Sequence, residues 1–498
     1  MFSAVRGQHA IRVRQWLSLE RTPFARIHSL DRELRQLAWL RWATGIVCFA
    51  RTVPIVYSSI DYIGAPSSGG LPELTIAGLW TLALVAVATA GIAAPLTLPL
   101  LMYEYQAYDL RMQTETLGTD VLMLLLALFW LAGAGSRLSF DAFWLRRRTW
   151  IAAPIRALYR VTGIASPDQL RRIYFLFFVA YGLLNFGAVI FHIDDPAWRS
   201  GSLMRVLFTS SYLSRFWEVF REIENKWPMA FQAFSVVGTL GQVVFQLFMI
   251  PLVWSRWGTR FVVTWGILFF VASLAILQLS YLPVLEIFLW IALFWRPRAP
   301  AVASEERYRP WLRSPLVGRV VVAAGTSALI VFALIGLPYM DDLWGPEVEP
   351  IRRGLQAFGL EVPVVLNRDD LRMGDAWPVI YRRDGERDVL LPYHGVDGER
   401  LAWVQWNDLF YFGNSLKWRR EYRGAESMDR AGDSFSRLVD VALFDHRHRG
   451  AARSDYAFVY FATDGSNADL DVGRRFERRH LGTAWIACSG KGESARCE

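Results

Sequence analysis

The sequence predicts an all-α, multi-pass membrane bundle of eight to nine transmembrane helices, followed by a C-terminal α+β domain outside the cytoplasm. Three observations support this fold class. Hydrophobic residues make up 53% of the 498 residues, and several apolar runs are long enough to cross a hydrocarbon core of about 30 Å. Arginines cluster beside these runs, as cytoplasmic anchors do. Beyond residue 340 the apolar runs are short and charges are frequent, which is typical of a domain in water.

The N-terminal segment, residues 1–36, is polar and basic. It lacks the compact apolar stretch and the small-residue cleavage site of a removable signal peptide, so the first span is expected to act as its own anchor. The transmembrane bundle is expected over residues 37–339. The extracytoplasmic domain is expected over residues 340–498, which are numerous enough to bury a core of their own.

Nine apolar segments are the candidate spans. They cover residues 37–60, 74–92, 94–108, 117–135, 172–192, 231–254, 260–279, 281–296 and 319–339. The third segment contains two prolines and turns polar at Glu104, so it either crosses the bilayer or forms a re-entrant or tilted segment.

The distribution of arginines predicts the orientation. The N-terminal segment and the connection at 136–172 are both rich in arginine and should be cytoplasmic, which requires an even number of crossings between them and favours a full third crossing. The basic turns at 255–260 and 296–313 then also fall inside, and nine crossings place the C-terminal domain outside. Lysine is nearly absent, as in proteins from GC-rich bacteria. The expected location is therefore a bacterial inner membrane, with a periplasmic C-terminal domain.

The net charge of +8 is compatible with nucleic-acid binding as well as with membrane anchoring. Because the arginines lie beside apolar spans, we interpret them as anchors in the lipid bilayer. The bilayer is therefore an expected partner, and a nucleic acid is not.

The segment 214–227 carries Phe216, Phe220, Ile223 and Trp227 three or four residues apart. This spacing gives a helix with one apolar face. It predicts either a helix that lies along the membrane surface or a short helix packed under an external loop.

The C-terminal domain shows both strand and helix patterns. Strands are predicted at residues 363–368, 377–383, 388–395, 456–463 and 483–490, and helices at 349–360 and 434–446. Cys488 and Cys497 lie in this domain and either form a disulfide in an oxidising compartment or remain free thiols. Cys48, in the first span, is expected to be a packing residue.

Polar side chains inside the spans are candidates for function, because each is costly in a bilayer unless it is paired or faces a wet cavity. These candidates are Arg51, Glu104, Asp120, Asn185, Gln246 and Glu286. Arg51 is expected to form an ion pair with Glu286 or Glu104, and the sequence leaves open whether that pair is structural or catalytic. Arg41, near the cytoplasmic end, is expected to extend toward the membrane surface.

His192 is the only histidine at membrane level, and it is followed by Asp194 and Asp195. An imidazole that titrates near neutral pH, oriented by a carboxylate, predicts a catalytic base. The alternative is a helix exit, with Pro196 preventing continuation and Trp198 in the interfacial belt. No metal site is expected: the segment "HRHR" at 446–449 has no companion ligands nearby and is interpreted as a solvated basic segment.

Residues 37 to 296 resemble the horizontally transferred transmembrane domain, the bacterial branch of the vitamin K-dependent γ-carboxylase superfamily. The stretches that carry the likeness are "LAWLRWATGIVCFARTV", "TDVLMLLLALFWLAGAGSRLSFDAFW", "RRIYFLFFVAYGLLNFGAVIFHIDDPAWRSGSLM" and "QVVFQLFMIPLVWSRWGTR". They include an internal arginine, a Ser-x-Asp turn and a span that exits into an acidic turn, in the family's order. The resemblance implies a helical membrane bundle with its reactive pocket near His192.

The chain departs from this family at the reactive positions. Where the carboxylases have an intramembrane lysine as base, this chain reads Phe191, His192 and Ile193. The family's Asn-His pair corresponds to Gly118 and Thr119, its later histidine to Phe270, and its acidic residue to Gln246. The only lysines are Lys226, Lys417 and Lys491, outside the expected spans. Arginine cannot replace lysine as a base, because it does not lose its proton. The resemblance therefore predicts no glutamate carboxylation, unless His192 replaces the lysine.

Three functions follow from these observations. The first is a non-carboxylating scaffold or accessory protein that retains an apolar pocket for a lipid or quinone-like molecule, with residues 340–498 binding a secreted peptide or protein. The second is a membrane enzyme in which His192 acts as base on an isoprenoid or quinone substrate. The third is a transporter in which Arg51, Glu104 and Glu286 line a path, although no internal repeat is evident.

Overall fold

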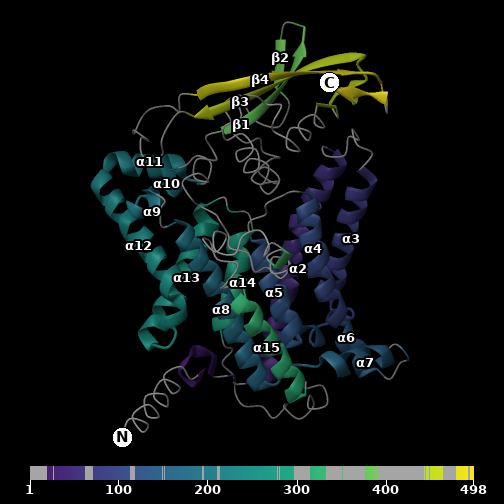
Figure 1. Ribbon diagram of the computed structural model, residues 1–498, viewed down its shortest axis with the longest axis vertical. Helices are drawn as coiled ribbons and strands as arrows, with labels where there is room; N and C mark the ends of the chain where they lie inside the picture. Colours follow the sequence, from purple (N-terminus) through teal and green to yellow (C-terminus); the bar gives the residue numbers. More distant parts are fainter. Residues whose placement is uncertain are drawn as a thin grey trace.

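The structure is a computed structural model, in which a helical bundle carries an antiparallel sheet over one end (Figure 1). The residues it describes are 19–25, 27, 29–61, 71–112, 118–147, 150, 152–192, 196–209, 214–277, 279, 281–295, 314–331, 350–351, 376–385, 387–390, 442–443, 445–447, 449–463, 478–491 and 494–497. Most of them are helical. The predicted strand at 363–368, most of the predicted helices at 349–360 and 434–446, and Asp194 and Asp195 lie outside these residues.

Each of the nine predicted spans coincides with a helix. These helices are α2 (Leu30–Asp61), α3 (Leu71–Ala90), α4 (Ala94–Met112), α5 (Thr119–Ala132), α8 (Pro167–His192), α12 (Pro228–Leu252), α13 (Arg256–Ile276), α14 (Leu282–Phe294) and α15 (Pro315–Val331). Shorter elements connect or flank them: η1 (Leu19–Arg21), η2 (Pro23–Ala25), η3 (Ala134–Ser136), α6 (Phe140–Arg146), α7 (Ala152–Thr162), α9 (Pro196–Arg199), α10 (Leu203–Thr209) and α11 (Trp217–Lys226).

Three of the described helices are long and apolar enough to cross a membrane by length and composition. They are the stretches Pro167–Ile190 in α8, Pro228–Leu252 in α12 and Arg256–Ile276 in α13. Shorter apolar helices accompany them at Ile76–Ala90, Thr119–Ala132, Leu282–Phe294 and Leu316–Val331. These apolar helices indicate a membrane-associated protein.

Glycines bring neighbouring helices of the bundle close together. A Cβ added to Gly241 on α12 would lie 2.1 Å from Trp265 Cη2 on α13. A Cβ added to Gly266 on α13 would lie 2.7 Å from Trp290 Cε2 on α14. Each glycine therefore makes room for an indole ring from the next helix. Small residues at such positions let membrane helices approach closely enough for van der Waals packing to hold them.

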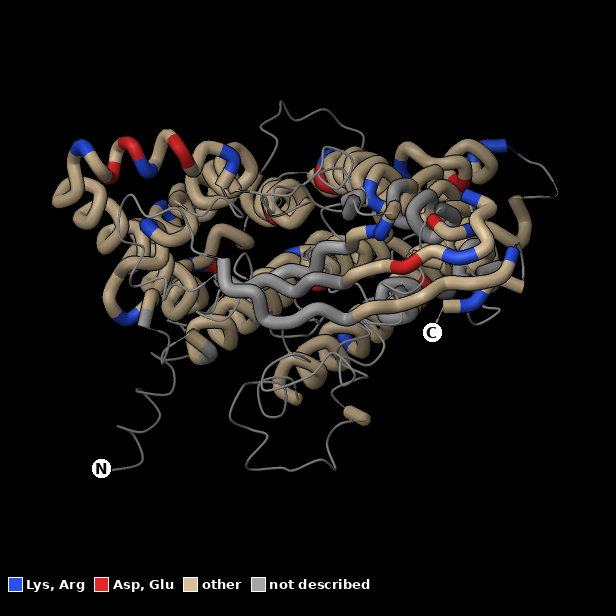
Figure 2. The backbone as a smooth tube through the Cα atoms, turned by 90° about the horizontal axis from the view of Figure 1, so that it is seen from above, with Lys and Arg blue, Asp and Glu red and all other residues tan. Residues whose placement is uncertain are grey.

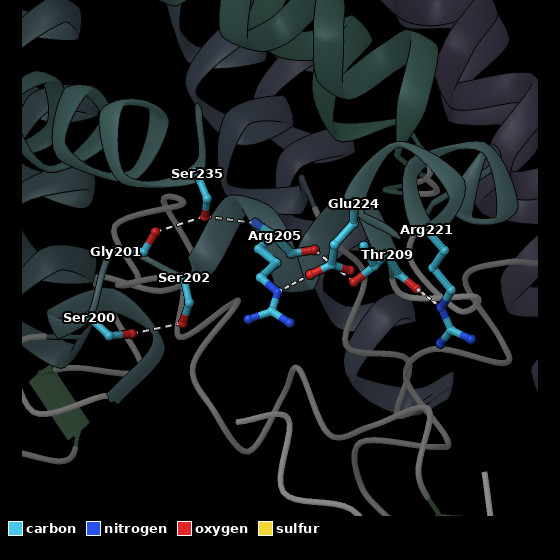
Figure 3. A network of polar contacts seen from close by, with 8 residues as sticks. All are labelled: Ser200, Gly201, Ser202, Arg205, Thr209, Arg221, Glu224 and Ser235. Atoms are coloured by element: carbon cyan, nitrogen blue, oxygen red, sulfur yellow. Dashed lines mark hydrogen bonds and ion pairs between the residues drawn. The ribbon is translucent and has the colours of Figure 1, made fainter. Parts of the chain in front are cut away.

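A second hydrophobic cluster forms beside the sheet end of the bundle and includes α10, α11 and the start of α12. Phe220 stacks on Phe208, with ring centroids 4.8 Å apart, and Ile223 packs against the same cluster. An ion pair joins Arg205 to Glu224 (Figure 3). Phe216 remains 50% exposed. The predicted helix at 214–227 is therefore α11, a short helix packed on α10 and α12 through part of its apolar face.

Polar contacts fix the turn that precedes α10. Ser235 Oγ, on α12, donates to the Gly201 carbonyl at 2.7 Å and accepts from the Arg205 amide at 2.9 Å (Figure 3). Arg221 Nε donates to the Thr209 carbonyl at the end of α10 at 3.1 Å. These bonds satisfy backbone groups at both ends of α10, which side chains or water must otherwise do.

The sheet has five antiparallel strands in the order β2-β1-β3-β4-β5. They are β1 (Ala376–Asp384), β2 (Arg387–Leu390), β3 (Arg453–Thr463), β4 (Arg478–Ser489) and β5 (Arg496–Cys497). Four of the five predicted strands thus correspond to β1 to β4. Cys488 and Cys497 are register partners in β4 and β5 and form a disulfide, which answers the question that the sequence left open.

Charged residues avoid most of the bundle. Seen from the sheet side, Figure 2 shows long uncharged stretches in the helices, with charges gathered on α11 and near the C-terminal end of the sheet. At the opposite end of the bundle, α6 and α7 lie across the ends of the long helices (Figure 1). Arg146 and Arg156 are in this layer.

Candidate functional site

A connected set of polar side chains lies inside the bundle. Tyr181 and Asn185 are four residues apart on α8 and so share a face. The Tyr181 hydroxyl donates to Glu286 Oε1 on α14 at 2.6 Å, and Asn185 Nδ2 donates to the Tyr181 carbonyl at 2.9 Å. From α12, Gln246 Nε2 donates to Asn185 Oδ1 at 3.4 Å. Three helices are therefore joined by one network, which we call the Tyr181 network.

The surroundings of the Tyr181 network are apolar and aromatic. Tyr181 is 3% exposed and Glu286 is 9% exposed. The ring of Trp290 lies 5.7 Å from that of Tyr181, and the ring of Phe270 lies 6.4 Å away, both edge-on. Because a buried polar group without a partner is costly, the hydrogen bond between Tyr181 and Glu286 is what makes both groups tolerable at this depth.

Arg51 lies in a neighbouring polar group between α2, α4 and α5. It is 1% exposed, its Nη2 donates to Thr119 Oγ1 at 3.0 Å, and its guanidinium lies 5.4 Å from the centre of the Tyr105 ring. Asp120 follows Thr119 in the first turn of α5. The hydrogen bond from Arg51 to Thr119 thus joins α2 to the start of α5.

The ion pairs expected for Arg51 are not formed among the described residues. Glu286 binds Tyr181 instead, and Glu104 lies half-buried on α4 without an ion pair to Arg51. The physical reason is the position of Tyr181: its hydroxyl reaches Glu286 and serves as a donor inside the bundle. Gln242, which shares a face of α12 with Gln246, accepts a hydrogen bond from Trp265 Nε1 at 3.1 Å.

His192 is the last residue of α8 and is 2% exposed. Its ring stacks on Trp198, with centroids 4.4 Å apart and planes inclined by 7°. Trp198 itself is only 7% exposed and packs into the second hydrophobic cluster. The expectation that it lies at the level of the interfacial belt stays a prediction. The position agrees with a helix exit at His192, and the roles of Asp194 and Asp195 stay predictions.

A second polar centre, which the sequence did not single out, closes the end of the bundle opposite the sheet. Asp141 is fully buried and accepts from the amides of Ala93 and Ala94 at 2.8 and 2.9 Å and from the Tyr159 hydroxyl at 2.9 Å. Burial raises the pKa of the Asp141 carboxyl despite these hydrogen bonds. Asp141 thereby caps the start of α4. The Ser-x-Asp turn at residues 139–141 is the sequence pattern that could have indicated this polar centre.

Arg41 belongs to the same end and is 1% exposed. Its guanidinium donates to the carbonyls of Ala134 at 3.2 Å and Leu138 at 2.9 Å. The expectation that Arg41 extends to the membrane surface is therefore wrong. The turn after α5 supplies backbone oxygens inside the protein, which replace the water that the charge would otherwise have to reach.

The segment beside β3 forms a compact polar cluster in the C-terminal domain. His446 is 1% exposed, with Nδ1 2.9 Å from Ser454 Oγ and Nε2 3.0 Å from the Gly490 carbonyl. The neighbouring Asp445 accepts from Arg382 Nη1 at 2.9 Å and from the Tyr456 hydroxyl at 2.8 Å. The interpretation of residues 446–449 as a fully solvated segment is therefore wrong for His446. Because His446 binds both Ser454 in β3 and the Gly490 carbonyl that follows β4, it links these two strands at one end of the sheet.

Family models, curated proteins and solved structures were compared with this chain, and none of them matches it.

The candidate residues are thus divided between separate places. Asn185, Gln246 and Glu286 belong to the Tyr181 network, Arg51 and Asp120 lie next to it, and no direct contact joins them to His192 among the contacts that the structure describes. Within the described part of the chain, no cluster of three or more histidine, cysteine or acidic residues is arranged to hold a metal ion. The sequence did not indicate Tyr181 as a site residue, because a tyrosine in an apolar span is usually interpreted as a packing residue.

An apolar groove of about 460 Å³ lies between α8 and α15. Phe175, Val179 and Leu183 line it from α8, and Val322 and Leu329 line it from α15. Arg172 and Thr326 are the polar residues among those that line it, and the others are aliphatic or aromatic. The predicted pocket for a lipid or quinone-like molecule stays a prediction.

Proposed function

We propose that this chain is a non-carboxylating membrane protein of the carboxylase-like superfamily, which acts as a scaffold or accessory protein. In this proposal its helices form a bundle with eight to nine crossings in a bacterial inner membrane. The N-terminus lies in the cytoplasm, and the sheet domain lies in the periplasm, where it engages a secreted peptide or protein.

The observation that carries this proposal is that the buried polar side chains of the bundle bind one another. Tyr181, Asn185, Gln246 and Glu286 hydrogen-bond to one another, and Arg51 binds Thr119. A general base must instead be within reach of the proton it removes from a substrate. A network whose members bind each other joins helices, which is what a scaffold requires.

The positions that correspond to the family's reactive residues support the same conclusion. Thr119 and Gln246 are members of these polar contacts, and Phe270 is 1% exposed in the aromatic wall around Tyr181. Gly118 has a φ of +93°, and a Cβ there would lie 3.0 Å from the Leu282 Cα. None of these side chains supplies a base, and the described spans contain no lysine.

The proposed orientation has support from both ends of the molecule. The disulfide between Cys488 and Cys497 is the kind of bond that persists in an oxidising compartment such as the periplasm. Arginines of α6 and α7 occupy the other end, as the positive-inside rule expects for the cytoplasm.

The test uses a strain that lacks this chain, complemented with the wild type or one of two variants, and measures the abundance of exported proteins. The proposal expects His192→Ala to restore the wild-type profile and a chain ending at residue 339 to fail, provided that both accumulate in the membrane. Purified wild-type protein should incorporate no labelled CO₂ into a glutamate peptide with reduced vitamin K. Loss of function in His192→Ala with a functional truncated chain would favour the enzyme, and carboxylation would refute the proposal outright.

The enzyme with His192 as base is the second candidate, because His192 is a buried imidazole and is held by a stacked indole ring. A His192→Gln variant separates the two ideas further. Glutamine keeps much of the shape and hydrogen-bonding capacity of histidine but cannot titrate, so it should preserve a structural role and abolish a base.

A further inference from the structure

An open groove of about 540 Å³ lies between the start of α2 and the end of α14. Two arginines, Arg32 and Arg35, line one part of it, and the rest is lined by Trp39, Leu40, Ile291, Trp295 and Gln36. The residues from α2 are spaced three or four apart, so they form one face of the helix. We call this feature the α2–α14 groove.

A direct link joins the two helices that form the α2–α14 groove. Gln36 Nε2 donates to the carbonyls of Ile291 at 3.0 Å and Trp295 at 2.9 Å, near the end of α14. The Ile291 carbonyl also accepts from the Trp295 amide, so the link adds to the helix's own hydrogen bond. The two walls of the groove are therefore joined by side-chain hydrogen bonds. Leu40 is 7% exposed and lies on its apolar side.

The residues that line the groove are of the kinds found at a membrane interface. Trp39 and Trp295 are 67% and 68% exposed, and both line the groove. Exposed tryptophans beside arginines, at the end of apolar helices, are typical of the level of the lipid headgroups. An occupant of this groove therefore meets cationic groups on one side and indole and aliphatic surface on the other.

The charge of the groove is positive. The described residues that line it include Arg32 and Arg35 and no acid. Asp31 is an acidic partner of Arg35, but it also pairs with Arg137, so two guanidiniums share one carboxylate. In the described part of α2, Glu33 is buried and accepts a hydrogen bond from the Tyr174 hydroxyl at 3.0 Å. Arg32 adds a further cation to the groove wall. Arginine binds phosphate oxygens through its planar set of N–H donors.

We propose that the α2–α14 groove binds an anionic phospholipid, with the phosphate against Arg32 and Arg35 and an acyl chain along Trp39, Leu40 and Ile291. A soluble phosphate compound fits only the basic half of this surface, whereas a phospholipid fits both halves. The proposal requires that the bundle is embedded in a membrane, and it is independent of what the C-terminal domain binds.

The test measures lipid binding to the detergent-solubilised full chain by native mass spectrometry, with phosphatidylglycerol and phosphatidylcholine as probes. Wild-type protein should bind phosphatidylglycerol more tightly. The double variant Arg32→Ala/Arg35→Ala should lose about thirty-fold in that affinity, the factor for two basic residues near an anionic headgroup at about 1 kcal/mol each. Binding of phosphatidylcholine should be unchanged.

Matched variants make the test specific. Arg146→Ala/Arg156→Ala removes two arginines from α6 and α7 at the same end of the bundle and should leave both affinities within about twofold. Trp39→Ala, at an exposed position, should weaken both lipids by a similar factor. Glycerol phosphate should not displace phosphatidylglycerol.

Three outcomes would overturn the proposal: equal affinity of the Arg32→Ala/Arg35→Ala variant and the wild type, an equal loss in the control pair, or displacement by glycerol phosphate. If the double variant fails to fold, Arg32→Gln and Arg35→Gln serve singly. Each single variant should then bind phosphatidylglycerol about fivefold less tightly than the wild type. The site would also be rejected if neither variant lost affinity.

Discussion

Replacement of Tyr181 by phenylalanine should destabilise the bundle by removing the donor to Glu286. The hydroxyl lies 2.6 Å from Glu286 Oε1, and Glu286 is only 9% exposed, so water cannot readily take its place. A hydrogen bond contributes about 0.5–1.5 kcal/mol net in soluble proteins, and a buried acceptor left without its donor costs about 1–3 kcal/mol; side-chain pairs between membrane helices contribute about 0.6 kcal/mol on average and at most about 1.7. We therefore expect a loss of about 1–2 kcal/mol in the free energy of unfolding.

The chain contains its own reporter for this measurement. Of the three cysteines, Cys488 and Cys497 form a disulfide, and Cys48 is a free thiol on α2 that is 2% exposed. A thiol-reactive dye therefore becomes fluorescent only when the bundle opens, and titration with SDS in mixed micelles gives the unfolding midpoint. Tyr103→Phe, at a position 66% exposed on α4, is the matched control and should change stability by less than about 0.5 kcal/mol.

A double-mutant cycle with Glu286→Leu isolates the pair, because leucine has no oxygen that could accept from the Tyr181 hydroxyl. The two single variants and the double variant should give a coupling energy of about 1 kcal/mol, because removing either partner already breaks the contact. Additivity within about 0.3 kcal/mol would refute the claim that this hydrogen bond joins α8 to α14. The claim would also fail if Tyr181→Phe were as stable as Tyr103→Phe.

Two further predictions concern helix packing and pH. In Gly266→Leu the new Cβ would lie only 2.7 Å from Trp290 Cε2. This overpacking should lower the free energy of unfolding in the dye assay by about 1–3 kcal/mol. The control Ala275→Leu, on the exposed face of the same helix, should change it little. Burial and the hydrogen bond to Asp445 raise the pKa of Tyr456, so its protonated form is favoured in the folded sheet. The stability from this shift is fully present below about pH 10, where the unfolded tyrosine titrates, and it is lost as the pH rises further. The hydrogen-exchange protection of β3 should therefore decline above about pH 10 in the wild type and decline less in Tyr456→Phe. An equal decline in the two proteins would contradict this prediction.

The helices of the bundle could be predicted from the sequence because hydrophobic length is a local property. Each apolar segment coincides with a helix, including the third one, which continues as α4 from Ala94 to Met112 despite Pro99. Whether the individual helices cross a membrane is a different question, since three helices in the described part of the chain have the length and hydropathy of a candidate span. The strands that give β1 to β4 were likewise visible as short apolar runs.

The contacts of single polar residues could not be predicted in the same way, because they depend on which backbone groups turn inward. Arg41 looked free to reach the surface, but the carbonyls of Ala134 and Leu138 lie within its reach. His446 looked solvated among arginines, but Ser454 and Gly490 enclose it from β3 and the end of β4. The disulfide was an open alternative until the pairing of β4 with β5 placed the Cα atoms of Cys488 and Cys497 4.0 Å apart.

The buried arginines explain why the polar groups of this bundle favour structure over proton transfer. Arginine keeps its proton at any physiological pH, so a buried guanidinium needs permanent acceptors. Arg41 obtains them from backbone carbonyls, and Arg51 from Thr119, with the Tyr105 ring beside it. A lysine in such a site could lose its proton and serve as a base, whereas an arginine can only join the elements that surround it. The carboxylase reaction needs a removable proton, whereas these arginines are fixed donors, and fixed donors hold helices together.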